Sequence, residues 1–185
     1  MNYAITPTLE LAFRAPDVPC TGAIEFAVGR CVEGGVLVAR SHLGICAIFL
    51  DDDAEGLRRQ LREAFGSDRI EEASRELGSD LASVVAFIDK SAAEGVIRLD
   101  VGGTTFQQRV WEALCSIPAG ETRSYAEIAE CIGAPQAVRA VAGACAANRL
   151  AIAIPCHRVV RGDGSISGYR WGVDRKRTLL EREHA

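Results

Sequence analysis

Ile154-Pro155-Cys156-His157-Arg158-Val159-Val160 is the stretch around which the rest of this sequence is organised. The apolar run 150–154 leads into it as an expected strand, and the glycine-rich loop 161–164 follows it. A thiol between an apolar strand and a glycine-rich loop, beside a basic side chain, is an arrangement that can position a nucleophile. The pattern therefore predicts a functional cysteine at position 156.

The adjacent His157 does not by itself make Cys156 catalytic. Consecutive residues on a strand point to opposite faces, so proton transfer between the two side chains needs a bent backbone or a bridging water. A free thiol with a pKa of about 8.5 is only slightly ionised at neutral pH and needs a base or a positive surrounding. A buried thiol beside a surface histidine stays open as the alternative.

The end of the chain offers a carboxylate that could complete a proton relay. A helix starting near Asp174 must turn Leu179 and Leu180 inward, and helical spacing puts Glu183 on the same face. An inward carboxylate needs a partner, and His157 is the candidate. The alternative is a frayed, solvated C-terminus.

Charge is unevenly distributed along the 185 residues. The net charge is −4, but residues 1–100 hold 10 basic and 17 acidic side chains, whereas residues 101–185 hold 11 and 8. The total is therefore uninformative, and the basic second half is the candidate anion-binding face.

Composition excludes several classes of protein. Seven scattered cysteines without a C-x-x-C pair argue against a disulfide framework or a zinc knuckle and favour reduced thiols in the cytoplasm. No signal peptide and no apolar run of about 20 residues, the length of a membrane span, is present. Cys20, Cys31 and His42 give no clear set of four ligands, so we expect no metal.

The residue pattern of the first half predicts a small α/β unit. No motif in this half indicates a function. Residues 1–22 look irregular, and helical spacing places two helices after the strands, the second capped by Ser79 or Asp80. Asp51–Asp53 ends the run of strands and starts the first of these helices. A few mostly antiparallel strands are expected at 23–28, 36–39, 45–50 and 97–101.

The second half predicts helices joined in a helix-turn-helix. Thr104 or Thr105 caps the first helix, and Ser124 with Glu127 forms a capping box at the next. The turn 133–135 follows, with Pro135 at the first position of a helix over about 136–148. Many packed helical hairpins share this pattern, so DNA binding is one of two interpretations.

The last of these helices has one side of small residues. Its buried stripe is expected at Val138, Val141, Ala142 and Cys145. The opposite side carries Ala140, Gly143, Ala144 and Ala147, with Arg139 at its edge. Small side chains would let the helix enter a minor groove only about 6 Å wide, and tight packing inside the protein is the alternative.

At this point the residues resemble a known family, the O6-alkylguanine-DNA alkyltransferases. Pro155-Cys156-His157-Arg158-Val159 is similar to that family's signature, and the chain is closest to the alkyltransferase part of the bacterial Ada-type proteins. The likeness is strong over 96–185 and fainter before it. It covers segments 103–111, 120–125, 137–142, 146–148 and 162–172, with weaker traces at 44–48 and 51–53.

The resemblance implies a fold of α/β plus α. A ribonuclease-H-like α/β domain would occupy residues 1–97, and a mostly helical, winged-helix-like domain with a helix-turn-helix would occupy 98–185. The zinc module and activator region of Ada-type proteins are not present in these residues, so their functions are not implied unless the chain is a fragment.

The resemblance also implies a function. The protein would flip O6-alkylguanine out of double-stranded DNA, approached from the minor groove, and transfer the alkyl group irreversibly to Cys156. It would be a methylated-DNA–protein-cysteine S-methyltransferase that acts once, as a monomer and without a cofactor. Whether O4-alkylthymine is also repaired is left open.

Roles follow residue by residue from the resemblance. Cys156 would accept the alkyl group, while His157, through a water, and Glu183 would carry its proton. Tyr125 would rotate the phosphate and help protonate the leaving guanine, and Asn148 would tie the recognition helix to the active-site turn.

The remaining implied roles concern DNA and the extruded base. Arg139 would enter the base stack, with Ala140, Gly143 and Ala144 beside it on the DNA face. Val159 and Ser167, with the Cys156 carbonyl, would contact the guanine, and Gly168 would leave room for it.

Two other functions stay open on the sequence. One is a DNA-binding transcription regulator in which Cys156 only senses alkylation. The other is a cysteine hydrolase that uses Cys156, His157 and Glu183.

Overall fold

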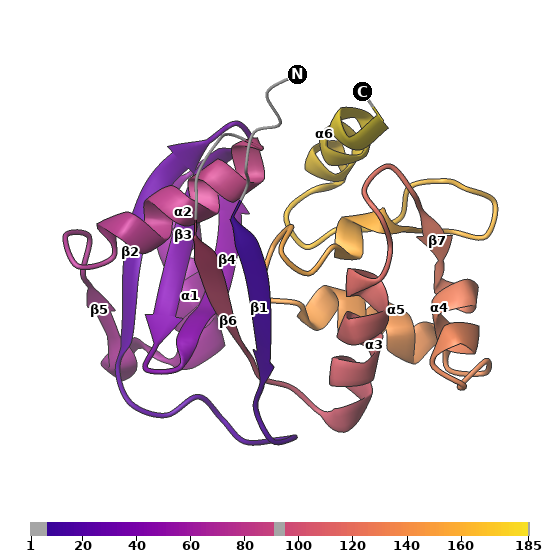
Figure 1. Ribbon diagram of the computed structural model, residues 1–185, viewed down its shortest axis with the longest axis horizontal. Helices are drawn as coiled ribbons and strands as arrows, with labels where there is room; N and C mark the ends of the chain where they lie inside the picture. The colour runs from indigo at the N-terminus through magenta and orange to yellow at the C-terminus, as the bar shows by residue number, and fades with distance from the viewer. Residues whose placement is uncertain (1–6, 91–94, 185) are drawn as a thin grey trace. The chain divides into compact units, whose positions relative to one another are not determined.

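The computed structural model describes residues 7–90 and 95–184, and the chain divides into two compact units, Met1–Gly102 and Gly103–Ala185 (Figure 1). The boundary expected after residue 97 falls within the last strand of the first unit, Val96–Val101. Residues 1–6, part of the segment expected to be irregular, lie outside the described residues.

The first unit is built on a mixed sheet, which confirms the α/β class. Within the described residues its strands follow the order β1-β6-β4-β3-β2-β5. They are β1 (Thr8–Phe13), β2 (Ile24–Cys31), β3 (Gly34–Ser41), β4 (Gly44–Asp51), β5 (Ile70–Glu72) and β6 (Val96–Val101). The hairpin expected at 36–50 is present, since β3 and β4 pair antiparallel around Gly44.

Two expectations about this sheet were wrong. Strand β1 lies in the segment expected to be irregular, and it pairs with β6, which is 88 positions away along the chain at Thr8↔Val96. The sheet is also not mainly antiparallel, because β1-β6, β4-β6 and β2-β5 run parallel. Parallel pairing between strands so far apart in the sequence leaves no local pattern from which it could be predicted.

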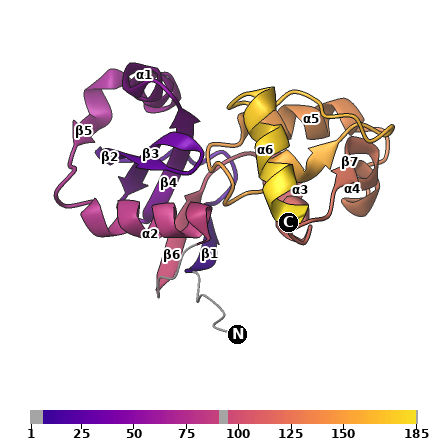
Figure 2. The same ribbon diagram turned by 90° about the horizontal axis from the view of Figure 1, so that it is seen from above.

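Helices α1 (Ala54–Phe65) and α2 (Gly78–Asp89) cover opposite faces of the sheet (Figures 1 and 2). Asp53 caps α1 by accepting from the Glu55 and Gly56 amides, as expected for the acidic run before it. A short 3₁₀ turn, η1 (Ser67–Arg69), precedes β5.

Neither expected cap of α2 was correct. The helix starts at Gly78 behind Leu77, with no side-chain cap, so Ser79 and Asp80 lie inside it. The Asp80 carboxylate instead accepts a hydrogen bond from Arg40 at 2.7 Å. The Asp80 side chain therefore pairs with a residue of strand β3 and does not cap the helix.

The second unit is mostly helical. It contains α3 (Thr105–Cys115), α4 (Tyr125–Cys131), α5 (Val138–Ala147) and α6 (Val173–His184), and a 3₁₀ turn, η2 (Cys156–Arg158). Two short strands, β7 (Arg123–Ser124) and β8 (Val159–Val160), pair parallel. No helix in the described part of the chain is long and apolar enough to cross a membrane.

The helix starts in this unit follow the capping rules. Thr104 forms a capping box with Gln107, and Ser124 forms the expected one with Glu127. Pro135 is not the first residue of α5, contrary to expectation. A turn closed by the Ala137 amide on the Ala134 carbonyl intervenes, and α5 begins only at Val138.

Candidate active site

The segment that leads to Cys156 is a compact turn, so the strand expected over 150–154 was wrong. The Ile154 amide donates to the Leu150 carbonyl at 3.0 Å. Ile152 has a φ of 66°, which is unusual for a β-branched side chain. A short run that is apolar throughout has no period that distinguishes strand from turn.

Asn148, at the end of α5, holds this turn together. Its side chain is fully buried, and its Oδ1 accepts from the Leu150 amide at 2.8 Å. Its Nδ2 donates to the Leu150 carbonyl at 3.3 Å, to the Ile154 carbonyl at 2.9 Å and to the Cys156 Sγ at 3.2 Å. One amide group therefore joins the helix, the turn and the thiol.

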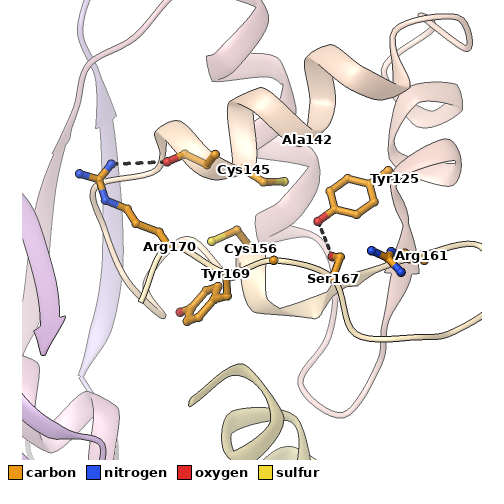
Figure 3. Close-up of a pocket in the computed structure, with 10 residues that line it drawn as sticks. Tyr125, Ala142, Cys145, Cys156, Arg161, Ser167, Tyr169 and Arg170 are labelled. Carbon is orange, nitrogen blue, oxygen red and sulfur yellow. Dashed lines mark hydrogen bonds between the residues drawn. The ribbon is translucent and has the colours of Figure 1, made fainter. Parts of the chain in front are cut away.

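Cys156 borders a cavity of about 550 Å³ (Figure 3). The cysteine itself is only 4% exposed. The walls come from α4, from the side of α5 that faces the cavity, and from the loop 161–170. They consist of Tyr125, Ala142, Cys145, Ala146, Arg161, Ser167, Gly168, Tyr169 and Arg170.

The thiol is protonated at neutral pH in this surrounding. Burial raises the pKa of Cys156 to about 11, while the Asn148 hydrogen bond and the charges of Lys176 and Arg170 act in the opposite direction. Burial also raises the pKa of the neighbouring Cys145 to about 12. A reaction of Cys156 as a nucleophile therefore needs a base to take its proton.

His157 and Glu183 are in contact, as helical spacing indicated. The His157 Nε2 lies 3.1 Å from the Glu183 Oε1, and His157 is fully buried. The side chain of Glu183 is 6% exposed, so neither a surface histidine nor a solvated carboxylate describes this pair. The 3₁₀ turn η2 replaces the strand geometry that was expected around Cys156 and His157.

Arg158 adds a second clamp on Glu183. Its Nε donates to Oε2 at 2.9 Å and its Nη2 donates to Oε1 at 2.7 Å. Burial by itself raises the pKa of Glu183, but the hydrogen bonds and charges of His157 and Arg158 outweigh it and hold this pKa well below its usual range. The carboxylate is therefore ionised and acts only as an acceptor.

The ionised carboxylate determines which nitrogen of His157 carries the proton. Nε2 must be the donor, so Nδ1 is the basic nitrogen, and it is buried with no hydrogen-bond partner among the described residues. Burial lowers the pKa of His157, which keeps the ring neutral at neutral pH. The pair thus presents an unprotonated nitrogen one residue from the thiol.

The contact between His157 and Glu183 is expected to make the stability of the fold sensitive to acid. Both folded-state pKa values are lowered, so stability falls as the pH drops below the ordinary values of 6.5 for His157 and 4.5 for Glu183. Urea unfolding of Glu183→Gln should show lower stability at pH 7 and a shallower loss below pH 4.5. The matched variant Glu181→Gln, at an exposed position of α6, should keep the wild-type slope; equal slopes in all three proteins would contradict the clamp.

Lys176 is a residue of this site that sequence reasoning missed. It is fully buried, and its Nζ donates to the Val159 carbonyl and, at 3.3 Å, to the Ser167 Oγ. Burial lowers its pKa, while the thiols of Cys156 and Cys145 raise it. The signal was available, because the helical spacing that turned Glu183 inward also places Lys176 on that face.

The side of α5 that was expected to face DNA is exposed only in part. Arg139, Ala140 and Gly143 are exposed. Ala144 is only 2% exposed, and its carbonyl accepts from the Trp111 Nε1 at 3.0 Å, so its place on the exposed face was wrong. α5 packs against both α3 and α4, and Trp111, the partner of the Ala144 carbonyl, belongs to α3.

The buried stripe expected on α5 also needs two corrections. Val141 and Cys145 are buried, but Val138 is 36% exposed. Ala142 is only half-buried and lines the cavity. Val138 is the first residue of α5, where the turn before the helix leaves its side chain uncovered.

Only some of the residues expected to contact the extruded base line the cavity. Ser167 and Gly168 line the cavity, and a Cβ at Gly168 would meet no atom within 4 Å. Tyr125 also lines it, with its hydroxyl 2.6 Å from the Ser167 Oγ. Val159 is fully buried and outside the lining, where its carbonyl accepts from Lys176.

Similarity to known proteins follows the second unit and extends into the first. Residues 105–185 match the family model for the DNA binding domain of 6-O-methylguanine DNA methyltransferase. The bifunctional transcriptional activator/DNA repair enzyme Ada of Escherichia coli is 51% identical over 161 residues, which is 87% of this chain and 46% of Ada. The chain therefore spans about half the length of this relative.

A shorter relative and a solved structure are covered more fully. The inducible methylated-DNA–protein-cysteine methyltransferase of Bacillus subtilis is 38% identical over 159 residues, which is 86% of this chain and 84% of that protein. The crystal structure of Mycobacterium tuberculosis OGT in complex with DNA matches with a TM-score of 0.70 at 34% identity. That match covers 86% of this chain and 92% of the OGT chain.

Proposed function

This chain belongs to the family of methylated-DNA–protein-cysteine methyltransferases, and from that membership we propose that it is a single-turnover DNA repair protein. It flips O6-alkylguanine out of duplex DNA and moves the alkyl group onto Cys156. The buried thiol at a cavity of about 550 Å³, followed in the chain by a histidine whose Nδ1 has no partner among the described residues, carries this proposal. A base of a DNA duplex reaches such a thiol only outside the stack.

The proton path starts at the thiol. Cys156 gives its proton through a bridging water to the Nδ1 of His157, which is the nitrogen without a protein partner in the described part of the chain. The imidazolium that forms is stabilised by the ionised Glu183 at 3.1 Å. Asn148 and Lys176 stabilise the thiolate, through a hydrogen bond at 3.2 Å and a positive charge respectively.

The transfer step needs no cofactor. The thiolate sulfur attacks the alkyl carbon, a C–S bond forms, and the C–O6 bond breaks with its electron pair going to the guanine. The departing guanine then takes up one proton, for which the Tyr125 hydroxyl in the cavity wall is the donor. Water does not hydrolyse a thioether at neutral pH. The alkyl group therefore stays on Cys156, and each protein molecule acts once.

The exposed side of α5 is the proposed DNA surface. Arg139 enters the base stack when the lesion leaves it, and the small residues Ala140 and Gly143 let the helix lie against a widened minor groove. Ala144 is buried and contributes packing instead. We propose that the protein acts on DNA as a monomer.

We also propose the finer fold assignments. The mixed sheet with a helix on each face supports a ribonuclease-H-like first unit. The pair α4 and α5 beside the small sheet β7-β8 supports a winged-helix-like second unit with a helix-turn-helix.

Methyl uptake from radiolabelled DNA tests this function. Wild-type protein should take up at most one equivalent from a duplex that contains O6-methylguanine. Arg139→Ala should slow uptake from the duplex by about 10-fold or more, because extrusion costs a few kcal/mol that the arginine helps to offset. Uptake from the free modified base should be nearly unchanged.

The control is Arg177→Ala, which removes an exposed arginine of α6 that pairs only with its helix neighbour Asp174 among the ion pairs of the described residues. It should leave both rates at wild-type values. An Arg139→Ala variant that is slowed equally on duplex and free base would contradict the extrusion role, and wild-type protein that takes up no label would contradict the function itself.

A further inference from the structure

The first unit holds a cluster of polar side chains that alkyl transfer does not use. At its centre is the buried Asp100 of β6. The Asp100 Oδ1 lies 2.9 Å from the Arg14 Nε, and its Oδ2 accepts from the Ser41 hydroxyl at 2.5 Å. The Cys20 Sγ lies 3.9 Å from the same Oδ2. A thiol thus shares a buried carboxylate with a cation and a hydroxyl.

Cys46 approaches this cluster from a bulge in β4. The register between β3 and β4 shifts between Ala39 and Arg40, which leaves Cys46 without an opposite residue on β3. A bulge re-aims the side chain of its extra residue. The Cys46 Sγ lies 3.5 Å from the Ala39 carbonyl. The same thiol donates a hydrogen bond to the Cys20 sulfur when that sulfur is ionised, so the two thiols are neighbours.

The loop that carries Cys20 is fixed to the rest of the first unit. The Arg69 guanidinium donates to the Cys20 carbonyl and, at 2.8 Å, to the Gly22 carbonyl. These bonds hold the Cys20 thiol beside Asp100. Cys20 is 7% exposed and Cys46 is 4% exposed, so only a small reagent reaches the pair.

The two thiols differ in reactivity. The hydrogen bond from Cys46 lowers the pKa of Cys20, and the charge of Arg14 adds to this effect, while burial and Asp100 oppose it. The same hydrogen bond and burial raise the pKa of Cys46. Cys20 therefore ionises first, and Cys46 keeps its proton. A thiolate is the form of cysteine that attacks an oxidant.

We propose that Cys20 and Cys46 form an oxidation site at which a hydroperoxide closes a disulfide bond, ahead of any reaction at Cys156. The Cys20 sulfur attacks the peroxide, an S–O bond forms and the O–O bond breaks. The leaving oxygen takes one proton, and Cys20 becomes a sulfenic acid. The Cys46 sulfur then attacks the Cys20 sulfur, an S–S bond forms, and water leaves with the Cys46 proton. Two electrons pass from the two sulfurs to the peroxide, and a thiol reductant reverses the reaction.

The alkyl acceptor should react later because its thiol is protonated. Burial raises the pKa of Cys156 to about 11. We therefore expect Cys20 to lose its free thiol at least about 10-fold faster than Cys156 at pH 7.

Stepwise oxidation of the whole reduced protein by hydrogen peroxide at pH 7 tests this site. Peroxide is raised until half of Cys156 has reacted, and at each step the remaining thiols are blocked with N-ethylmaleimide in denaturant. Trypsin releases the peptides 15–30 and 41–58, which contain Cys20 and Cys46 as their single cysteines. Mass spectrometry should find these two peptides linked, with two hydrogens fewer than their sum, and dithiothreitol should separate them.

Two variants sharpen the test. Cys46→Ser should give no linked peptide and should leave a sulfenic acid on Cys20 that dimedone traps, whereas wild type should give little of this adduct. Cys31→Ser is the matched control, because it removes a half-buried thiol at the end of β2, and it should form the link at the wild-type rate. The wild-type digest decides the question even if Cys46→Ser does not fold.

Two results would overturn the oxidation site. One is recovery of peptides 15–30 and 41–58 as separate maleimide adducts when half of Cys156 has already reacted. The other is a disulfide that joins Cys20 to a cysteine other than Cys46.

Discussion

Cys156→Ala is expected to abolish methyl uptake from O6-methylguanine DNA completely. The substitution removes the sulfur that forms the new bond, and no other thiol has the same surroundings. Cys145 lines the same cavity, but burial raises its pKa to about 12, and Asn148 donates to the Cys156 sulfur. Incubation with radiolabelled substrate DNA, followed by counting of protein-bound label, measures the loss.

The matched control for this variant is Cys131→Ala, which removes an exposed thiol from the last position of α4. It should take up one equivalent of label at the wild-type rate. Circular dichroism should show both variants folded, because alanine at position 156 deletes only one small side-chain atom. Label on the folded Cys156→Ala protein would show that another residue accepts the methyl group.

Asn148→Ala is expected to have the second largest effect, on stability and on rate together. The amide of Leu150 and the carbonyl of Ile154 would lose their side-chain partner in a fully buried site. Each unpaired buried group costs about 1–3 kcal/mol, so the free energy of unfolding should fall by about 3 kcal/mol. Loss of the hydrogen bond to the thiolate should slow transfer by about 10- to 100-fold.

Asn148→Asp separates the two roles of this side chain. The aspartate keeps an acceptor for the Leu150 amide, but it places a negative charge next to the Cys156 sulfur. It should slow methyl transfer more than Asn148→Ala does, and the pH dependence of iodoacetamide labelling should show a higher thiol pKa. If the aspartate variant transferred methyl groups faster than the alanine variant, the hydrogen bond to the sulfur would not support the thiolate.

The helical part of the site could be predicted because its signals are local. The capping box of Ser124 and Glu127 marks the start of α4, and helical spacing from Leu179 and Leu180 brings Glu183 to the interior. The contact between Glu183 and His157 followed from the need of a buried carboxylate for a partner.

The features that sequence reasoning missed depend on distant contacts or on exceptions to burial rules. Strand β1 exists because β6 pairs with it, which no local pattern encodes. Lys176 lies on the same helix face as Glu183, yet lysine is so rarely buried that its spacing alone carried no weight. Ala144 is buried because α5 contacts two helices, and the sequence of one helix shows only its own period.

The conformation of the turn before Cys156 could not be predicted either, although its contacts are close in the sequence. The run 150–154 is apolar throughout, and its conformation is set by the buried side chain of Asn148, which bonds to Leu150 and Ile154. A side chain that replaces backbone partners leaves no trace in a hydrophobic pattern.

The most direct test of alkyl transfer to Cys156 is the mass of the tryptic peptide 150–158, which contains this residue, after incubation with DNA that carries one O6-methylguanine. The proposed function predicts that this peptide gains the mass of one methylene group, that fragmentation places it on Cys156, and that the gain stops at one equivalent. An unchanged peptide from protein that has demethylated the DNA, or a methyl group on another residue, would contradict it.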